Sequence, residues 1–195
     1  MLIITIKQGK EKSLLERQPW IYLSAVERVD GKHNEKMSSG ATALVRSSSA
    51  QFLARAAWSP KSQIRARVWT FDEQEAVDHA MIKRRVQAAL GKRKALKAAN
   101  AKTVSKPQRL INAEEDGLPG LLVDYYDLAP GYLVCQFQAA GVDAWKVPIV
   151  KALIAATGCK NVYEHADELV RKGEGLPVTD GVLAGEEPPY EIPLR

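Results

Sequence analysis

Alternating polar and apolar positions dominate the first 70 residues and predict β-strands there. In the stretch SQIRARVW, residues 62–69, small or branched apolar side chains alternate with arginines. Because successive side chains of a strand point to opposite faces, the two sets lie on opposite sides. One face carries Ile64, Ala66 and Val68, and the other carries Arg65, Arg67 and Trp69. The apolar face is expected to line a core, and the arginine face needs an explanation of its own.

Further short strands and one short helix are predicted in the same region. The helix spans about residues 11–17 and ends before Pro19, which disfavours helical geometry at Gln18. The run DGKHNEKMSSG is polar and contains glycine, so we expect a loop. The strands are LIITI, SAVERV, ATALV, FLARAAW and SQIRARVWTF. Many short strands with one helix predict a small barrel-like β domain over residues 1–72.

A helix is predicted from Glu75, where acidic residues favour the N-terminal end of the helix dipole. Its apolar stripe consists of Ile82, Val86, Ala89 and Leu90, which recur at helical spacing. The sequence that follows, GKRKALKAANAK, is basic and rich in alanine. We expect a frayed extension or a linker there, with its cations on a solvated helix face rather than in a phosphate grip.

Strands, turns and one helix alternate over residues 108–165. RLINA, LLVDYY and YLVCQF are strand-like and are joined by the turns EEDGLPG and DLAPG, which predicts an antiparallel meander. The amphipathic helix VDAWKVPIVKALIAAT is expected to end at Gly158, and NVYEH to return as a strand. The acidic tail, rich in glycine and proline, is typical of a linker to another domain. The expected fold class is α+β: a β-barrel followed by a small α/β domain over residues 73–195.

Charge divides the chain unequally. The 195 residues have a formal net charge of +5, whereas residues 1–70 carry +7, residues 71–110 carry +6 and residues 111–195 carry −8. A basic front half joined to an acidic back half indicates that the front half binds a polyanion. Nucleic acid fits better than an anionic membrane, because the basic helix lacks the large apolar residues that membrane binding needs.

Several other classes of protein find little support in the residues. The sequence has no apolar run of about 18 residues, and its N-terminus lacks the charge pattern of a secretory signal, so we expect a cytoplasmic protein with no membrane contact. Cys135 and Cys159 have no histidine nearby in metal spacing. We therefore expect two reduced thiols in the core and no metal site.

The candidates for catalysis are weak. The segment DGLPGLLVD resembles a glycine-rich cofactor loop, but its glycines precede a strand, so a hairpin turn is predicted. His165 has acidic neighbours in YEHADE, but alternation places Glu164 on the opposite face. The serines of RSSSAQ lie between two strands, without the strand-turn-helix elbow of a nucleophile. We assign no catalytic, cofactor-binding or metal-binding residue.

Basic residues interleaved with aromatic ones indicate an RNA-binding site. Cations neutralise phosphates, while guanidinium and indole planes stack on unpaired bases. Aromatic side chains are mostly buried, so Trp20 and Trp58 are expected in the core. Trp69 either stacks on RNA or packs at the junction with the next domain, because its strand leads directly there. The predicted RNA-binding residues are Lys10, Lys12, Arg17, Arg55, Lys61, Arg65, Arg67 and Trp69.

Several long blocks of the sequence resemble one protein family. KQGKEKSLLERQPWIY and FLARAAWSPKSQIRARVWTFD are similar to the N-terminal RNA-binding PUA-type domain of the bacterial ribosomal RNA large subunit methyltransferase I type. RLINAEEDGLPGLLVDYYD, VYEHADELVRKGEGL and GVLAGEEPP resemble the middle domain of that family, in the same order. The resemblance covers essentially the whole chain. It implies an enzyme that uses S-adenosylmethionine to methylate carbon 5 of a cytosine in 23S ribosomal RNA.

The same resemblance implies a third, C-terminal Rossmann-like domain that binds the methyl donor and carries the catalytic cysteine. The chain ends at PPYEIPLR before that domain, and neither Cys135 nor Cys159 matches the family's nucleophile. We therefore expect a fragment without its own cofactor, inactive by itself, that binds 23S ribosomal RNA and positions it for methylation. Dimerisation is left open. The alternatives are a standalone adaptor that binds RNA or recruits a protein, and a small enzyme that uses His165.

Glycines that the family usually carries are absent at three places. Ala56 stands where the family has glycine after Leu-Ala-Arg, the turn RSSSAQF lacks a customary glycine, and Ala113 precedes the EEDGLPG turn. A lost glycine costs about 1 kcal/mol or more where the backbone needs its conformational freedom. Local strain is expected at these turns.

Overall fold

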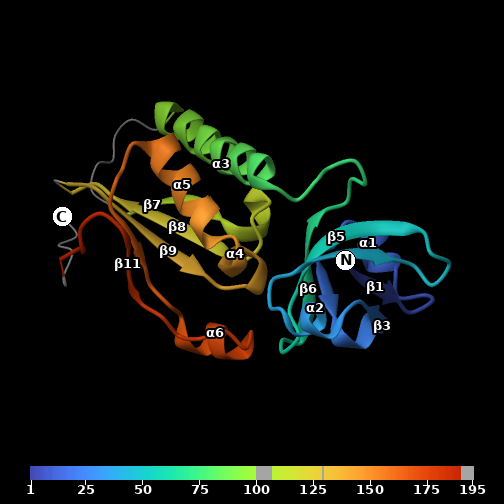
Figure 1. Cartoon of the computed structure of the whole chain (residues 1–195). Coiled ribbons are helices and arrows are strands. Elements are labelled where there is room, and N and C mark those ends of the chain that lie inside the picture. Colours follow the sequence, from blue (N-terminus) through green and yellow to red (C-terminus); the bar gives the residue numbers. More distant parts are fainter. Residues whose placement is uncertain (100–106, 129, 190–195) are drawn as a thin grey trace.

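The computed structural model describes residues 1–99, 107–128 and 130–189. Two separate β-sheets organise the chain (Figure 1), one within residues 2–70 and one within residues 108–184. We call residues 1–71 the N-terminal unit and residues 79–189, as far as they are described, the C-terminal unit. The α+β class is confirmed. The domain division near residue 72 stays a prediction.

The first sheet has six mostly antiparallel strands. They are β1 (Leu2–Ile6), β2 (Trp20–Tyr22), β3 (Val26–Asp30), β4 (Thr42–Arg46), β5 (Phe52–Trp58) and β6 (Ile64–Thr70). Their order is β2-β6-β5-β4-β1-β3, in which β1 and β4 pair in parallel. Three short helical segments connect them: α1 (Lys12–Leu15), η1 (Leu23–Ala25) and α2 (His33–Met37). The sheet curls around a core that includes Ile4, Val45, Ala54, Ala66 and Val68.

The strand β6 has the two faces that its alternation predicts. Ala66 and Val68 are buried in the core of the first sheet, and Ile64 at the strand's beginning is half-buried. The strand lies between β2 and β5. Its second face turns toward the C-terminal unit at Arg67 and Trp69, as the contacts described below show.

The second sheet has the order β11-β10-β9-β8-β7. Its strands are β7 (Gln108–Asn112), β8 (Leu121–Tyr126), β9 (Tyr132–Phe137), β10 (Val162–Glu164) and β11 (Gly181–Ala184). The predicted meander is confirmed, because β8 pairs antiparallel with both β7 and β9. The helices are α3 (His79–Ala99), α4 (Ala140–Ala144), α5 (Lys146–Thr157) and α6 (Glu168–Gly173), and η2 (Ala113–Asp116) follows β7. In Figure 1, α3 and α5 lie side by side over one face of this sheet.

Some boundaries differ from those that the sequence predicts. α3 begins at His79 rather than Glu75, because the Asp78 carboxylate accepts the backbone N–H of Met81 at 2.8 Å and caps the helix there. The segment predicted as a loop contains α2, whose first turn is closed by Glu35, since this carboxylate accepts a backbone N–H at 2.9 Å. The acidic tail, residues 173–195, contains β11, which pairs with β10, so this part of the tail is a strand of the second sheet rather than a linker.

Other expectations for the C-terminal unit agree with the structure. α5 ends at Gly158, whose φ of 74° is the left-handed conformation that suits glycine. The extension after residue 91 is helical to Ala99, and the rest of that predicted linker lies outside the described residues. Among the helices that the structure describes, none combines the length and hydropathy needed to cross a bilayer.

Two alanines, in turns where glycine was expected, adopt the left-handed conformation that glycine favours. Ala50, in the turn between β4 and β5, has a φ of 66°, and Ala113, at the start of η2, has a φ of 47°. A left-handed alanine costs roughly 1–2 kcal/mol relative to a relaxed one, because its Cβ crowds the following carbonyl. Ala56 is different, since it lies buried within the extended strand β5.

Replacing either left-handed alanine by glycine is expected to stabilise the protein. Ala50→Gly and Ala113→Gly each relieve the crowding of a Cβ, with an expected gain of about 1 kcal/mol in the free energy of unfolding. Chemical denaturation followed by circular dichroism measures this gain. The matched control is Ala155→Gly, at an exposed position of α5, which should lose about 0.5–1 kcal/mol. Equal destabilisation by all three variants would contradict the assignment of strain.

Candidate nucleic-acid interface

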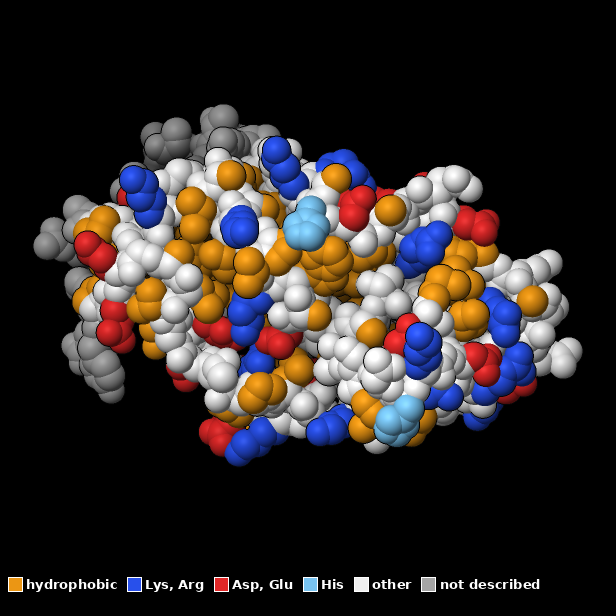
Figure 2. Space-filling model, viewed as in Figure 1, with side chains coloured by type: hydrophobic (Ala, Val, Ile, Leu, Met, Phe, Trp, Pro, Cys, Tyr) orange, Lys and Arg blue, Asp and Glu red, His pale blue; other side chains and the backbone are white. Residues whose placement is uncertain are grey.

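Four of the predicted RNA-binding residues are exposed on the N-terminal unit. Lys10 precedes α1, Lys12 is its first residue, Arg17 follows its end, and Lys61 lies in the turn between β5 and β6. The guanidinium carbon of Arg17 lies 5.1 Å from the ring centre of Phe71, which holds this charge near the end of β6. On the face shown in Figure 2, Lys and Arg side chains lie among hydrophobic ones over this unit. Such a surface can attract an anion and present apolar groups beside it.

Arg55 and Arg65 are only partly exposed, because each makes contacts within the N-terminal unit or with the segment that directly follows it. Arg55 donates to the backbone carbonyl of Glu73 at 3.0 Å and lies over the ring of Phe52. Arg65 donates to the carbonyl of Pro60, and its guanidinium carbon lies 5.8 Å from the ring centre of Trp58. Each of these two arginines therefore uses part of its guanidinium group to hold a nearby turn or loop in place.

Arg67 does not point outward as the sequence predicts. Its side chain is 14% exposed, and its two terminal nitrogens pair with acids of the C-terminal unit, Glu114 at 3.1 Å and Glu174 at 2.7 Å. The carboxylate of Glu174 also accepts hydrogen bonds from Ser59 and Ser62. Alternation correctly places Arg67 away from the barrel core, but the second unit covers that face. Arg67 is thus a junction residue.

Trp69 is also at the junction, which resolves the two alternatives that the sequence leaves open. It is 4% exposed and belongs to the hydrophobic core of the C-terminal unit together with Ala57. A Cβ built on Gly141, the second residue of α4, would lie only 2.9 Å from the indole ring. This close approach leaves no room for a base on Trp69, so its predicted RNA contact is wrong.

Trp20 and Tyr22 are exposed. For Trp20 this is a correction, because aromatic side chains are mostly buried and Trp20 was expected in the core. They are 40% and 49% exposed, and Ile21 between them is 2% exposed. Trp20 donates its indole N–H to Glu114 at 2.9 Å, and the guanidinium carbon of Arg67 lies 5.2 Å from its ring centre. Trp58 is 7% exposed, as expected. The signal for Trp20 is the WIY alternation, which is too short to settle which face is buried.

The space left at the junction is small. A cleft there is lined by Trp69, Gly141 and Glu174, among other residues, and has room for about one water molecule. The cleft is therefore a packing feature rather than a substrate pocket.

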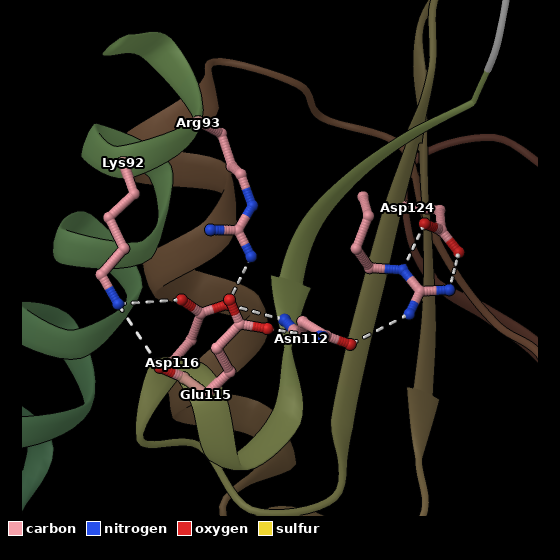
Figure 3. A network of polar contacts seen from close by, with 7 residues as sticks. Lys92, Arg93, Asn112, Glu115, Asp116 and Asp124 are labelled. Carbon is pink, nitrogen blue, oxygen red and sulfur yellow. Dashed lines mark hydrogen bonds and ion pairs between the residues drawn. The ribbon is translucent and has the colours of Figure 1, made fainter. Parts of the chain in front are cut away.

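A buried carboxylate fixes the turn that carries Glu114 (Figure 3). Asp116 is the last residue of η2, and its side chain is fully buried. Its oxygens pair with Lys92 at 3.2 Å and Arg93 at 2.9 Å from α3, and accept the backbone N–H of Asn112 at 2.8 Å. Compensation by two cations and a hydrogen bond makes the burial of this charge tolerable. The turn is thereby held against α3 while Glu114 reaches the N-terminal unit.

The residues considered for catalysis do not form a reactive site. The His165 side chain is 61% exposed and faces Asp180, with Nδ1 3.4 Å from the carboxylate, whereas Glu164 is buried and paired with Lys146. The two neighbours therefore point to opposite faces, as predicted. Both cysteines are free thiols, and burial raises the pKa of Cys135, which disfavours the reactive thiolate. Among the described residues no three metal-binding side chains cluster.

The Arg67 pairing is expected to stabilise the junction. Arg67→Ala removes two ion pairs and leaves the buried carboxylate of Glu174 without its cation, so the free energy of unfolding should fall by about 3 kcal/mol. Urea denaturation provides the measurement. The control is Arg28→Ala, which removes an exposed pair with Asp30 and should cost less than about 1 kcal/mol. Equal effects of the two variants would show that the junction pairing adds no stability.

The buried Asp116 is expected to matter more than the half-buried Asp124, which is also drawn in Figure 3. Asp116→Ala strands Lys92 and Arg93 and removes the acceptor of an N–H, with an expected cost of about 3 kcal/mol. Asp124→Ala removes the pair with the half-exposed Arg109 and should cost about 1 kcal/mol or less. Thermal and urea unfolding of both variants measure the difference. Similar costs would contradict the role of Asp116 as the anchor of η2.

Comparison with protein families gives a match for the first sheet. Residues 4–71 match the family model of a PUA-like domain. Solved structures show the fold over 98% of this chain. One is described as a candidate SAM-dependent methyltransferase from Streptococcus mutans, with a TM-score of 0.73 and 16% identity, and 45% of it is covered. Another, described as a candidate methyltransferase complexed with SAH, has a TM-score of 0.74, 16% identity and the same coverage.

Curated relatives extend the likeness over nearly the whole chain. Proteins named ribosomal RNA large subunit methyltransferase I are 42% identical in Aliivibrio fischeri and 43% identical in Photobacterium profundum, each over 192 residues. The Yersinia pseudotuberculosis protein is 40% identical over 191 residues. Each match covers 98% of this chain and 46% of the relative. The chain therefore carries a PUA-like match in residues 4–71 and, over nearly all of its length, is similar to about half of a ribosomal RNA large subunit methyltransferase I.

Proposed function

We propose that this chain binds large-subunit ribosomal RNA of the 23S type through its N-terminal unit and positions it for methylation, in the cytoplasm. The observation that carries the proposal is the coincidence of the PUA-like match with exposed cations on the same unit. Lys10, Lys12, Arg17 and Lys61 are exposed within or beside the matched residues 4–71. The substrate is taken from the name that the relatives share. The expectation that the chain is a fragment of a longer enzyme stays a prediction.

Electrostatics supports RNA binding by the N-terminal unit in particular. Residues 1–70 carry a net charge of +7, whereas residues 111–195 carry −8. Phosphates are attracted to the first region and repelled by the last, so the field orients an approaching RNA. Because Arg67 is neutralised at the junction, the proposed contacts are Lys10, Lys12, Arg17 and Lys61, with the exposed parts of Arg55 and Arg65.

We place methyl transfer outside the described residues. S-adenosylmethionine, which the resemblance implies, needs a strand, a glycine loop and a helix N-terminus in succession. Here Gly117 and Gly120 lead into the strand β8, and a Cβ on Gly120 would lie 2.5 Å from the Cβ of Ala139. Gly120 therefore serves close packing and not a cofactor cradle. The turn with Gly117 and Gly120 does not fit the methyl donor, and we derive no catalytic step from it.

Salt-dependent RNA binding tests the proposal. A labelled 23S ribosomal RNA fragment, titrated with the protein at several salt concentrations, should bind more weakly as salt rises, with a log-log slope of about −0.7 to −0.9 per neutralised phosphate. The double variant Lys10→Ala/Lys12→Ala should flatten the slope by about 1.5 and weaken binding by about tenfold. Fluorescence anisotropy measures both quantities.

Two lysines of the C-terminal unit supply the matched control. Lys151 and Lys160 are equally exposed, and Lys151→Ala/Lys160→Ala should leave the slope unchanged. Absence of RNA binding at low salt, or binding that salt does not affect, would refute the proposal. Stable capture of one protein partner without RNA affinity would favour the adaptor role instead.

A further inference from the structure

We propose that Trp20 and Tyr22 form an aromatic platform on which unpaired RNA bases stack, so that the N-terminal unit prefers single-stranded or looped RNA to duplex RNA. This inference rests on the proposed function and adds the kind of RNA that the surface selects. The two residues lie on the outer face of β2 and are 40% and 49% exposed. A large exposed aromatic pair on a folded unit calls for a partner with planar apolar faces.

The geometry of β2 sets the spacing of the two rings. Ile21 is buried between them, so Trp20 and Tyr22 project from the same face of the strand. Alternate side chains of a strand are about 6.6–6.8 Å apart along it. An extended nucleic-acid strand covers this distance in one nucleotide step, and a stacked duplex does not. The platform therefore fits two adjacent unpaired bases.

Trp20 is held in position before any ligand arrives. Its indole N–H donates to Glu114 at 2.9 Å, and the guanidinium carbon of Arg67 lies 5.2 Å from its ring centre. Fixing the ring from two sides lowers the entropic cost of stacking a base on it. The Glu114 carboxylate is itself paired with Arg67 at 3.1 Å, which reduces its repulsion of a phosphate.

Charge favours RNA over other occupants of this apolar surface. β2 begins three residues after Arg17, and Lys10 and Lys12 lie just before and at the start of the preceding helix α1. In the sheet β2 is an edge strand that pairs only with β6 among the described residues, so its outer side is open. Single-stranded nucleic acid binds surfaces of this kind, because the cations contact its phosphates while the aromatic rings stack on its bases. A second copy of this chain would bring the same positive charges together.

Competition between two RNA forms tests the platform. The probes are a labelled 12-nucleotide single strand and the 12-base-pair duplex of the same sequence. Tyr22→Ala should weaken single-strand binding by about tenfold, since stacking is worth roughly 1–3 kcal/mol per base. Duplex binding should change by less than about twofold. Tyr22 has no side-chain hydrogen bond among the described residues, so this variant is expected to fold.

Quenching of tryptophan fluorescence supplies a second measurement, which reports on the stacking of bases on Trp20. Trp58 and Trp69 are 7% and 4% exposed, and Trp145 is half-buried against the core of the C-terminal unit, so the part of the quenching by single-stranded RNA that is lost in Trp20→Phe reports on Trp20. Trp20→Phe retains a ring for stacking but loses the hydrogen bond to Glu114, so it should lose most of the quenching and only part of the affinity. The control is Leu169→Ala, at an apolar position of α6 that is 84% exposed, and it should change neither readout.

Each result discriminates between the two proposals. If RNA binds with salt dependence but Tyr22→Ala binds both probes like the parent protein, the platform is wrong and the proposed function stands. If the parent protein binds no RNA, both are wrong. If analytical ultracentrifugation shows a dimer that Tyr22→Ala dissociates, a second copy occupies the surface and the platform proposal is overturned.

Discussion

The ion pairs between the two units converge on a single guanidinium. Arg67 projects from β6, the second strand of the first sheet, and is held by two carboxylates of the C-terminal unit, Glu114 and Glu174. The two acids come from segments 60 residues apart in sequence, the η2 turn and the end of α6. A planar group with several donors can satisfy both at once, which a lysine could not do with the same geometry. Arg67 thus joins the η2 turn and the end of α6 to the same strand of the N-terminal unit.

Small residues allow the units to approach closely around that contact. A Cβ at Gly40 would lie 2.4 Å from the carbonyl oxygen of Ala140, and one at Gly141 would lie 2.6 Å from the Cβ of Ala57. The two units therefore meet almost directly at α4. Trp69 fills the remaining space and joins the core of the second unit. The junction combines close packing with a compensated charge, and such an interface resists rotation of one unit on the other.

The sequence predicts well which side of a strand is apolar and poorly what covers the other side. Alternation in β6 identified Ala66 and Val68 as core residues, yet it treated Arg65 and Arg67 alike, although only Arg67 meets the second unit. Nothing local to WIY distinguishes Trp20 from Trp58, because exposure depends on strands that lie far away in the sequence. The exposed cations near α1 were predictable, since charge in a short polar segment rarely becomes buried. The glycine-poor turns were predictable too, because backbone conformation is a local property.

The order of strands in the first sheet has a consequence for synthesis. β2 pairs with β6, so Trp20 faces Arg67 across the sheet, and β1 pairs in parallel with β4. A ribosome extends the chain from the N-terminus, and β2 therefore has no strand to pair with until more than 40 further residues have been made. During that interval the WIY segment lacks the strand with which it pairs in the folded protein. The nascent chain is thus most prone to associate with other chains before β6, which carries Arg67, has been translated.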